Sequence, residues 1–474
     1  MTTKANGFGI DLRLSAALLV AKTTAAGIRV AGRGGGTSAP GLVAERVDPG
    51  LLHKLTSRLE HGVVMVAGTN GKTTTSRMVA DLLEAAGMPP VHNRSGSNLV
   101  RGVVSAFAAQ ASLAGAPGGT VGVIEADEAA LPQLLAMVAP RVVLLSNLFR
   151  DQLDRYGELD AIANRWRPAL ERLPSNTTVV VNADDPTLAA ITSDIRAQVV
   201  RFGMNEANHR LDTLSHAADA ANCRVCGADL AYHALYVSHL GDWYCPQCGY
   251  ARPVLDFTGS DIELHGVESL DMCVREGETS TPIHVGVPGL YNAYNLLAAA
   301  AVGRAMGVEM PVIVGAMHAF RSAFGRIERV AYRGRTLTLA LVKNPVGFNE
   351  VLRMLTAETG GLEVPTLIAI NDLYADGRDV SWLWDVDFEL LASGGGPLGA
   401  TGIRGADMAN RLKYAGIPEE RLTRYPDDFE SSLDAFVDTI PEGGAGYILP
   451  TYTAMLQIRK ILADRGAVET FWKQ

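Results

Sequence analysis

Residues 63–74 of the chain, VVMVAGTNGKTT, decide its fold. The apolar run 63–67 predicts a buried strand, the glycine-containing run 68–71 predicts a tight loop, and a helical pattern follows. Backbone N–H groups of such a loop close on phosphate oxygens, and the helix N-terminus adds partial positive charge. We therefore predict ATP binding by the following residues, with Lys72 at the β/γ-phosphates and Thr73 holding Mg²⁺: Gly68, Thr69, Asn70, Gly71, Lys72, Thr73 and Thr74.

The phosphate loop is of a shortened type, because the position five before Gly71 is Val66 and not the glycine of GxxxxGKT. A glycine-rich turn with a chance Lys-Thr pair is the alternative, which the order of strand, loop and helix disfavours. The chain has eight lysines, and none lies between Lys72 and Lys343. A lysine in this loop is consistent with a need for a compact charge that arginine does not supply.

Composition indicates a globular enzyme. The 474 residues allow two or three domains, and 47% apolar residues suffice for their cores. A net charge of −9 without basic runs argues against nucleic acid as the main ligand. The apolar stretch 16–21 is too short to span a bilayer and lacks a signal-peptide cleavage pattern. We expect a cytoplasmic protein that still meets membrane-borne substrates.

Four of the five cysteines form two CxxC pairs separated by eighteen residues: Cys223, Cys226, Cys245 and Cys248. This spacing predicts a zinc ribbon, and a glycine follows each pair, as suits a zinc knuckle. Two disulfides are the alternative, which the expected cytoplasmic location disfavours. Four thiolates fill the coordination sphere, so we expect a structural Zn²⁺. Cys273 is expected to be a small buried hydrophobe.

The chain divides into three predicted parts. Residues 1–60 are expected to be a helical segment, and residues 61–325 an α/β domain with a parallel sheet, interrupted by the zinc ribbon at about 205–260. Residues 326–474 are expected to form a second, Rossmann-like α/β domain. Strands are predicted at 63–67, 121–125, 142–146, 178–182, 336–342, 366–370 and 447–450.

Carboxylates follow two of these strands. The strand 121–124 ends at Glu125, beside the phosphate loop, where a carboxylate suits Mg²⁺ coordination. The strand 142–146 leads to Asn147, Asp151 and Asp154, for which a solvated loop is the alternative.

Further motifs follow in order, namely NADDP at 182–186, GLYNAYNLLAAA at 289–300 and FGRIE at 324–328. Together with the phosphate loop they resemble the Mur ligase family, whose members join an amine to a carboxylate through an acyl phosphate. The resemblance covers residues 61 to about 330. It implies that Thr73 and Glu125 hold Mg²⁺, that Asn292 and Asn295 lie near the adenine, and that Arg326 reaches the nucleotide.

The chain departs from the family pattern in three places. Residues 151–154 are DQLD where the family has DHLD, so Gln152 replaces a histidine metal ligand. The carbamylated lysine of many members has no counterpart between Lys72 and Lys343. The DYAHNP-like motif is ALVKNP at 340–345, without its acidic residue. The first 60 residues are also too few for the usual UDP-binding domain.

The remaining motifs are similar to a branch of the family that amidates peptidoglycan: GGGTSAPG at 34–41, LFRDQLDRYGE, LVKNPVGFNE and INDLYADGRDVSWLWDVDFE, with the zinc ribbon. The resemblance implies ATP-dependent amidation of the α-carboxylate of D-glutamate in the lipid II stem peptide. It implies a heterodimer with a glutaminase, docked on the C-terminal domain. The chain offers no glutaminase nucleophile itself, because Cys273 lies outside a glycine-flanked elbow.

The segment 377–389, GRDVSWLWDVDFE, interleaves Asp379, Asp385 and Asp387 with aromatic residues. One interpretation is an amphipathic element with its aromatics in the core and its aspartates in water. The other is that one aspartate orients the glutaminase histidine across the interface, with Asp385 as first choice and Asp387 as second. Two other functions stay open, namely a folylpolyglutamate synthase-like ligase and a nucleotide-binding scaffold.

Overall fold

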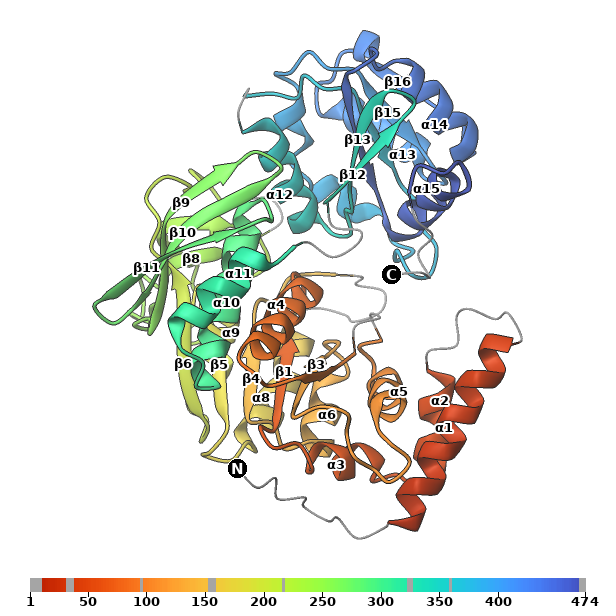
Figure 1. Ribbon diagram of the computed structural model, residues 1–474. Coiled ribbons are helices and arrows are strands. Elements are labelled where there is room, and N and C mark those ends of the chain that lie inside the picture. The colour runs from red at the N-terminus through yellow and green to blue at the C-terminus, as the bar shows by residue number, and fades with distance from the viewer. Residues whose placement is uncertain are drawn as a thin grey trace.

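The computed structural model describes residues 11–30, 38–93, 97–151, 159–214, 218–321, 327–357 and 360–468. It contains a nine-stranded sheet, a two-stranded hairpin and a six-stranded sheet. The six-stranded sheet lies in the blue C-terminal part of Figure 1. None of the helices in these ranges has both the length and the apolar character needed to cross a membrane.

The large sheet has a parallel centre. Its strand order is β11-β10-β9-β6-β5-β4-β1-β3-β2. The strands from β2 to β9 in this order all pair in parallel. Their bounds are β1 (Val63–Ala67), β2 (Pro90–His92), β3 (Val121–Glu125), β4 (Val142–Leu145), β5 (Thr178–Asn182), β6 (Gln198–Met204), β9 (Phe257–His265), β10 (Ser269–Glu276) and β11 (Thr279–Val285).

Both faces of this sheet are buried, which explains why its central strands are apolar throughout. In β1, Val64 and Val66 face one core, and Met65 faces the other. The first core is covered by α4 (Lys72–Ala85), α10 (Leu290–Ala305) and α11 (Met310–Ala319). The second is covered by α1 (Leu12–Val30), α2 (Ala39–Val47), α3 (Leu51–Thr56), α5 (Val100–Gln110), α6 (Leu131–Met137), α8 (Leu159–Glu171) and α9 (Pro186–Ile191).

The sheet is not wholly parallel, contrary to the sequence prediction. Strands β9, β10 and β11 form an antiparallel extension. Their short connections contain Gly266 and Gly277, both with positive φ, and connections this short join only antiparallel neighbours. In addition, β9 starts at Phe257, inside the range expected for the zinc ribbon, and pairs with β6.

The C-terminal sheet is mixed, with the order β12-β13-β17-β14-β15-β16 and only β12 antiparallel. Its strands are β12 (Ile327–Tyr332), β13 (Arg335–Ala340), β14 (Thr366–Ala369), β15 (Leu398–Thr401), β16 (Leu422–Arg424) and β17 (Ala445–Pro450). Two further cores cover its faces. The helices are α12 (Pro345–Thr356), η1 (Ser381–Asp385), η2 (Phe388–Leu391), α13 (Gly405–Tyr414), η3 (Glu419–Arg421), α14 (Phe429–Asp438) and α15 (Tyr452–Asp464).

Candidate active site

The phosphate loop connects β1 to α4 and depends on two glycines. Gly68 has φ +150°, and a Cβ there would lie 2.0 Å from Ser146 Oγ. Gly71 has φ +80°, and its Cβ would lie 2.1 Å from Asn295 Oδ1. Neither position has room for a side chain, so the loop keeps its tight path. The first N–H groups of α4 therefore open toward the loop, where helix geometry leaves them without partners in their own helix.

Asn147, which lies just after β4, holds the phosphate loop in place through side-chain hydrogen bonds. Its Oδ1 accepts from Asn70 N at 2.8 Å and from Thr69 N at 3.2 Å, and its Nδ2 donates to Asn70 O at 3.0 Å. Thr69 Oγ1 also accepts from Phe149 N at 3.0 Å. The segment after β4 therefore fixes the loop in place, as expected for residues at the same edge of the sheet.

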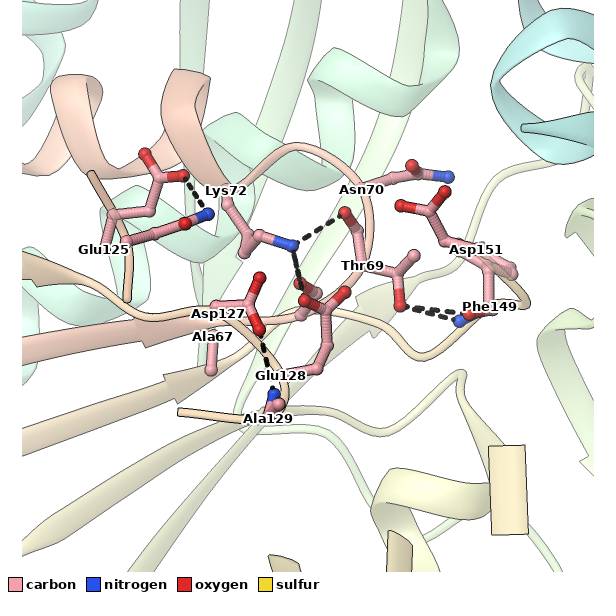
Figure 2. Close-up of polar contacts among 12 residues, drawn as sticks. Ala67, Thr69, Asn70, Lys72, Glu125, Asp127, Glu128, Ala129, Phe149 and Asp151 are labelled. Atoms are coloured by element: carbon pink, nitrogen blue, oxygen red, sulfur yellow. Dashed lines mark hydrogen bonds and ion pairs between the residues drawn. The ribbon is translucent and has the colours of Figure 1, made fainter. Parts of the chain in front are cut away.

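Lys72 is buried in the loop with a carboxylate partner. Its side chain is 9% exposed, and its Nζ donates to Gly68 O at 2.6 Å. The same Nζ donates to Thr69 O at 3.1 Å and lies 3.0 Å from Glu128 Oε2 (Figure 2). Burial raises the pKa of Glu128, an effect that the charge of Lys72 opposes. The ammonium group of Lys72 is thus already ordered at the N-terminus of α4.

Thr73 and Glu125 face each other, as predicted for a shared Mg²⁺. Thr73 Oγ1 donates to Glu125 Oε1 at 3.3 Å, and Glu125 is buried at the end of β3. Asn93 Nδ2 donates to Glu125 O at 3.0 Å and fixes the end of the strand. A hydroxyl and a carboxylate are oxygen ligands of the type that Mg²⁺ prefers, so this pair fits a Mg²⁺ bound to ATP.

The C-terminal half reaches into the site through two residues before α12. Lys343 Nζ forms a close ion pair with Asp151 Oδ2. Asn344 Nδ2 donates to Asn70 Oδ1 at 2.8 Å, and Asn70 Nδ2 donates to Asn344 Oδ1 at 3.3 Å. In Figure 2, Asp151 lies on the Asn70 side of the loop, away from Glu125. The two halves of the molecule therefore meet on the phosphate loop.

A cavity of about 410 Å³ opens above the loop, a size usual for small-molecule sites. Its polar lining includes Thr69–Thr73, Glu125, Glu128 and Lys343. Its apolar and aromatic lining comes from the segment after β4, the zinc-ribbon hairpin, α10 and the C-terminal half: Phe149, Val237, Leu240, Tyr291, Tyr294, Leu341, Val346, Val351, Tyr374, Ala375 and Tyr452. Such a cavity can hold a nucleotide with its phosphates on the loop.

Of the other predicted nucleotide contacts, one lines the cavity, one lies behind it and one is outside the described residues. Asn295 lines the cavity, and its Oδ1 accepts from Thr75 Oγ1 at 3.0 Å. Asn292 is buried behind it, accepts from Asn295 Nδ2 at 2.9 Å, and is not among the residues that line the cavity. Arg326 and Asp154 lie outside the described residues.

The four predicted zinc ligands come together. Their sulfurs lie within 4.8 Å of one another, with 3.6 Å from Cys223 Sγ to Cys248 Sγ and 3.5 Å from Cys226 Sγ to Cys245 Sγ. A tetrahedral Zn²⁺ with bonds of about 2.3 Å requires sulfurs about 3.8 Å apart. The cluster therefore fits a structural zinc ion. Cys273, in contrast, is only half-buried in β10 and lies outside the cluster.

The zinc ribbon carries the hairpin β7 (Ala231–Val237) and β8 (Leu240–Tyr244), which links it to the cavity. Arg252, just after the last cysteine, donates to Asp184 Oδ1 at 2.7 Å, and Tyr294 of α10 donates to Asp184 Oδ2 at 2.7 Å. Arg353 of α12 donates to Tyr236 O at 3.0 Å. Gly241 N of the hairpin donates to Asp184 O at 3.1 Å, so the hairpin contacts both halves of the molecule.

The acidic aromatic segment forms η1 and η2. Phe388 is fully buried, whereas Trp384 is 53% exposed, so its aromatics do not share one face. Asp387 Oδ2 accepts from Asn349 Nδ2 at 2.9 Å. Asp385 is half-exposed, and its Oδ2 lies 3.6 Å from Arg150 Nη2. The simple amphipathic interpretation is therefore wrong for Trp384.

Sequence reasoning did not assign roles to Glu128, Lys343 or Asn344. The sequence signal for Glu128 was the run EADE at 125–128, in which two adjacent carboxylates, Asp127 and Glu128, follow Glu125. The signal for the other two was the Lys-Asn-Pro run, in which Asn344 caps α12 through Gly347 N at 2.9 Å. Sequence spacing alone cannot bring residue 343 to residue 151.

Two family models match the chain. The Mur ligase middle domain matches residues 66–244, and the MurT ligase C-terminal model matches residues 341–455. The MurT subunit of lipid II isoglutaminyl synthase (glutamine-hydrolyzing) from Streptococcus pneumoniae is 33% identical over 92% of this chain and 94% of its own. The MurT subunit of Staphylococcus aureus (strain COL) is 31% identical over 94% and 96%.

Solved structures share the fold. A pseudomurein peptide ligase type C from Methanothermus fervidus has a TM-score of 0.66 at 18% identity, covering 85% of this chain and 78% of its own. MurF from Acinetobacter baumannii has a TM-score of 0.63 at 17% identity, covering 89% and 80%. At these identities the likeness concerns the fold alone, and it confirms the predicted Mur ligase-type architecture.

Proposed function

Because the chain belongs to the MurT subunits of the Mur ligase family, we propose that it amidates the α-carboxylate of D-glutamate in the stem peptide of lipid II, giving D-isoglutamine. The carboxylate attacks the γ-phosphorus of ATP, forming an acyl phosphate and releasing ADP. Ammonia then attacks the acyl carbon, and phosphate leaves as the amide forms. The enzyme is an ATP-dependent carbon–nitrogen ligase. We place its reaction in the cytoplasm, at the membrane surface that carries lipid II.

The observation that carries this proposal is the shared cavity. Thr69–Thr73 and Glu125 line it from the central half, whereas Lys343 and Asn344 line it from the C-terminal half. We assign the phosphates to residues 68–74. Lys72 stabilises the charge that develops on the transferred phosphoryl group, since an ordered ammonium acts there at little cost of reorganisation. Thr73 and Glu125 would hold the Mg²⁺ of ATP, which neutralises phosphate charge when bound.

The adenine and ribose are assigned to the apolar and aromatic lining of the cavity, with Asn295 nearer the loop and Asn292 supporting it. Arg326 is retained as a proposed nucleotide contact from the family resemblance. The four-cysteine cluster is assigned a structural zinc, since its four thiolates leave no open coordination position for water.

Ammonia is assigned to a separate glutaminase of the GatD type, as a heterodimer with this chain. Free ammonia is scarce at neutral pH, and glutaminases release it with a cysteine nucleophile paired with a histidine. Four of the five cysteines of this chain gather in the zinc cluster, and Cys273 lies on the antiparallel extension. The "subunit" in the names of both relatives supports a partner chain.

Asp385 is the proposed contribution of this chain to the glutaminase reaction. It would orient the partner's histidine, as the aspartate of a Cys-His-Asp arrangement does. Its half-exposed carboxylate favours it over Asp387, whose Oδ2 is bonded to Asn349. We expect Asp385→Asn to abolish glutamine-dependent amidation and to keep most activity with saturating ammonium. Loss of both activities would place Asp385 in the ligase site or in the fold instead.

The primary test incubates the purified chain with ATP, Mg²⁺, ammonium and lipid II. We expect ADP release coupled to a stem-peptide mass change from hydroxyl to amine. ADP release without amidation would show that the acceptor is wrong. ADP release with folate and glutamate would favour a folylpolyglutamate synthase-like ligase. No ADP with any carboxylate, even with the glutaminase present, would favour a nucleotide-binding scaffold.

A further inference from the structure

Helix α1 (Leu12–Val30) has an apolar face on the side opposite to the one that it packs into the core. The packed side consists of Leu14, Ala17, Leu18 and Ala21. The exposed residues of the opposite side follow one another at intervals of three or four, which places them on one face of a helix: Leu12, Ala16, Leu19, Thr23, Ala26 and Val30. We call this set the outer stripe. Its large members Leu12, Leu19 and Val30 are 77%, 51% and 90% exposed, and a row of such residues indicates a contact surface.

The outer stripe is apolar along the whole helix. Its one polar member, Thr23, directs its hydroxyl at the helix backbone, since Thr23 Oγ1 lies 3.0 Å from Leu19 O and 3.1 Å from Val20 O. None of the described helices, α1 included, is both long and apolar enough to cross a membrane. A helix with this stripe can therefore lie on an apolar surface but does not pass through a bilayer.

Basic residues border the outer stripe on both sides. At about 3.6 residues per turn, Arg13 lies at one border, and Lys22 and Arg29 lie at the other. Arg13 Nε and Lys22 Nζ donate to the neutral carbonyls of Val47 and Ala109, both at 2.8 Å, so the two side chains keep their positive charge. The helix has no acidic residue. The first 44 residues contain five basic residues and one acidic residue, although the whole chain has a net charge of −9, so this end is complementary to an anionic surface.

We propose that α1 lies flat on an anionic lipid surface, with its outer stripe between the headgroups and the acyl chains. In this position Arg13, Lys22 and Arg29 extend to the anionic headgroups on either side of the helix. The inference rests on the proposed function and deepens it, because the lipid-linked substrate of that reaction is held in such a membrane. The contact confines the enzyme to the surface on which its substrate diffuses.

Two protein partners fit the outer stripe less well. A helix of 19 residues is about 28 Å long, and a stripe about 10 Å wide on it offers roughly 300 Å². A stable dimer buries about 800 Å² on each copy, so the stripe is too small for a second copy of this chain. The glutaminase is expected on the C-terminal half, whereas α1 packs on the central half. A lipid surface requires only an apolar face and positive charge, and α1 has both.

The position of α1 connects this contact to the active site. In Figure 1, α1 stands at the outer edge of the molecule, beside α2 and α5. Gly41 N of α2 donates to Ser105 Oγ of α5 at 2.7 Å, and a Cβ at Gly41 would lie 2.1 Å from Arg101 O, so α2 and α5 are closely packed. Lys22 of α1 is bonded to Ala109 O of α5. Binding of α1 to a membrane therefore holds the central half, and the phosphate loop with it, at a fixed distance from the lipid.

Sedimentation of the full chain with lipid vesicles tests the contact without ATP or lipid II. Vesicles of equal parts phosphatidylglycerol and phosphatidylcholine should bind the wild type at least about tenfold more tightly than vesicles of phosphatidylcholine alone. Leu19→Glu should lower binding to the anionic vesicles at least about tenfold, because its carboxylate would have to enter the lipid interface. Ile403→Glu is the matched control, since Ile403 is 50% exposed on the C-terminal half, and it should bind as the wild type does.

Leu12→Glu is a second variant, placed where folding tolerates it. Leu12 is the first residue of α1, and a negative charge in the first turn stabilises a helix. The variant should keep the wild-type melting temperature and should lose vesicle binding as Leu19→Glu does. Equal binding of the wild type and both variants would overturn the proposal, and so would equal binding of the wild type to the two kinds of vesicle.

The alternative occupants have their own measurements. A dimer of the wild type in sedimentation velocity that Leu19→Glu dissociates would assign the outer stripe to a second copy. Weaker glutaminase binding by Leu19→Glu would assign the stripe to the glutaminase. Either result would overturn the lipid contact.

The last measurement separates this inference from the proposed function. With ATP, Mg²⁺, ammonium and lipid II in the anionic vesicles, Leu19→Glu should raise the KM for lipid II at least about tenfold at an unchanged kcat. With a lipid-free muropeptide that carries the same stem peptide, the variant and the wild type should have equal kcat/KM. A wild type that binds vesicles but does not amidate lipid II would overturn the proposed function alone. A wild type that amidates lipid II but does not bind vesicles would overturn the lipid contact alone.

Discussion

At the scale of single residues, the position of the Lys72 ammonium group is fixed by partners that suit a lysine side chain. Its Nζ is held by Gly68 O and Glu128 Oε2, inside a loop that two glycines keep tight. Lys72→Arg should fail there, because a planar guanidinium cannot replace a compact ammonium. We expect kcat/KM for ATP to fall at least about 100-fold, or about 2.7 kcal/mol, in an assay of ADP release with ammonium and lipid II. Lys54→Arg, on the surface, is the control, and near-normal activity of Lys72→Arg would remove Lys72 from phosphate binding.

Asp376 gives a pH-dependent prediction. Burial raises its pKa above the usual 3.8, while hydrogen bonds from Thr453 oppose the shift. A carboxyl with a raised pKa in the folded state stabilises the fold below its unfolded pKa, and that stabilisation is lost as pH rises through the folded pKa. Asp376→Asn does not titrate, so its free energy of unfolding relative to wild type should increase from pH 3.8 upward. Urea unfolding at several pH values measures this, and a pH-independent difference would contradict it.

The phosphate loop was predictable from the sequence because strand, loop and helix are local. The partners of its residues were not. Glu128, Lys343 and Asn344 reach Lys72, Asp151 and Asn70 through the tertiary fold, over separations as large as 274 residues. The roles of these residues, as of Asp385 and Asp387, stay predictions.

At the scale of elements, α12 connects helix capping to the phosphate loop. Asn344 Oδ1 caps the helix, and Asn344 Nδ2 donates to Asn70 Oδ1. Asn344→Ala should lose both and cost about 1 kcal/mol of stability. Asn344→Asp keeps the cap but cannot donate, so its melting temperature should stay near wild type while its KM for ATP rises at least about threefold. Equal KM values for Asn344→Asp and wild type would show that the hydrogen bond from Asn344 to Asn70 does not contribute to ATP binding.

The zinc ribbon gives the second prediction at this scale. Its hairpin lines the main cavity, and it is bonded to Asp184 through Gly241 N and to Arg353 through Tyr236 O. We expect Cys248→Ser to lose zinc, to melt at a lower temperature and to raise the KM for ATP at least about threefold, because zinc binding contributes directly to folding. Cys273→Ser, outside the cluster, is the control. A zinc-free variant with a normal KM for ATP would show that the ribbon does not affect the active site.

The elements also show what periodicity can predict. Strands β1, β3 and β5 have the predicted bounds, since each is built on an apolar run with turn or loop residues beside it. The antiparallel strands β9–β11 were missed because polar residues separate their apolar ones, as in β9, where buried and exposed residues alternate. Such alternation is typical of a half-buried strand and differs from the uninterrupted apolar runs of the central strands. These strands are joined by short turns at Gly266 and Gly277. A pattern of strands alternating with helices, which predicts a parallel sheet, does not include such turns.

At the scale of the whole molecule, both halves contribute residues to the candidate active site. Lys343 meets Asp151, Asn344 meets Asn70, and Arg353 meets the zinc-ribbon hairpin. No local pattern predicts this arrangement, because it depends on how two separately folded sheets pack.

The same C-terminal half exposes a patch suited to a partner. Trp384 is 53% exposed and Tyr414 is 70% exposed, their rings are 5.7 Å apart, and Asp385 is next in sequence. Exposed tryptophan and tyrosine are typical anchors of protein interfaces. Trp384→Ala should weaken glutaminase binding at least about tenfold, measured by titration calorimetry, with ammonium-dependent amidation within about twofold of wild type.

The control for the partner patch is Leu113→Ala, an exposed apolar residue on the central half, which should bind glutaminase normally. Unchanged binding by Trp384→Ala would move the docking surface away from η1, and Asp385 would then be too far from the partner to orient its histidine. Because one aromatic side chain and one carboxylate are adjacent in the chain, docking and glutaminase activation should be lost together in Trp384→Ala at low partner concentration. Excess partner should restore activity to Trp384→Ala but not to Asp385→Asn, since only the second lacks the orienting group.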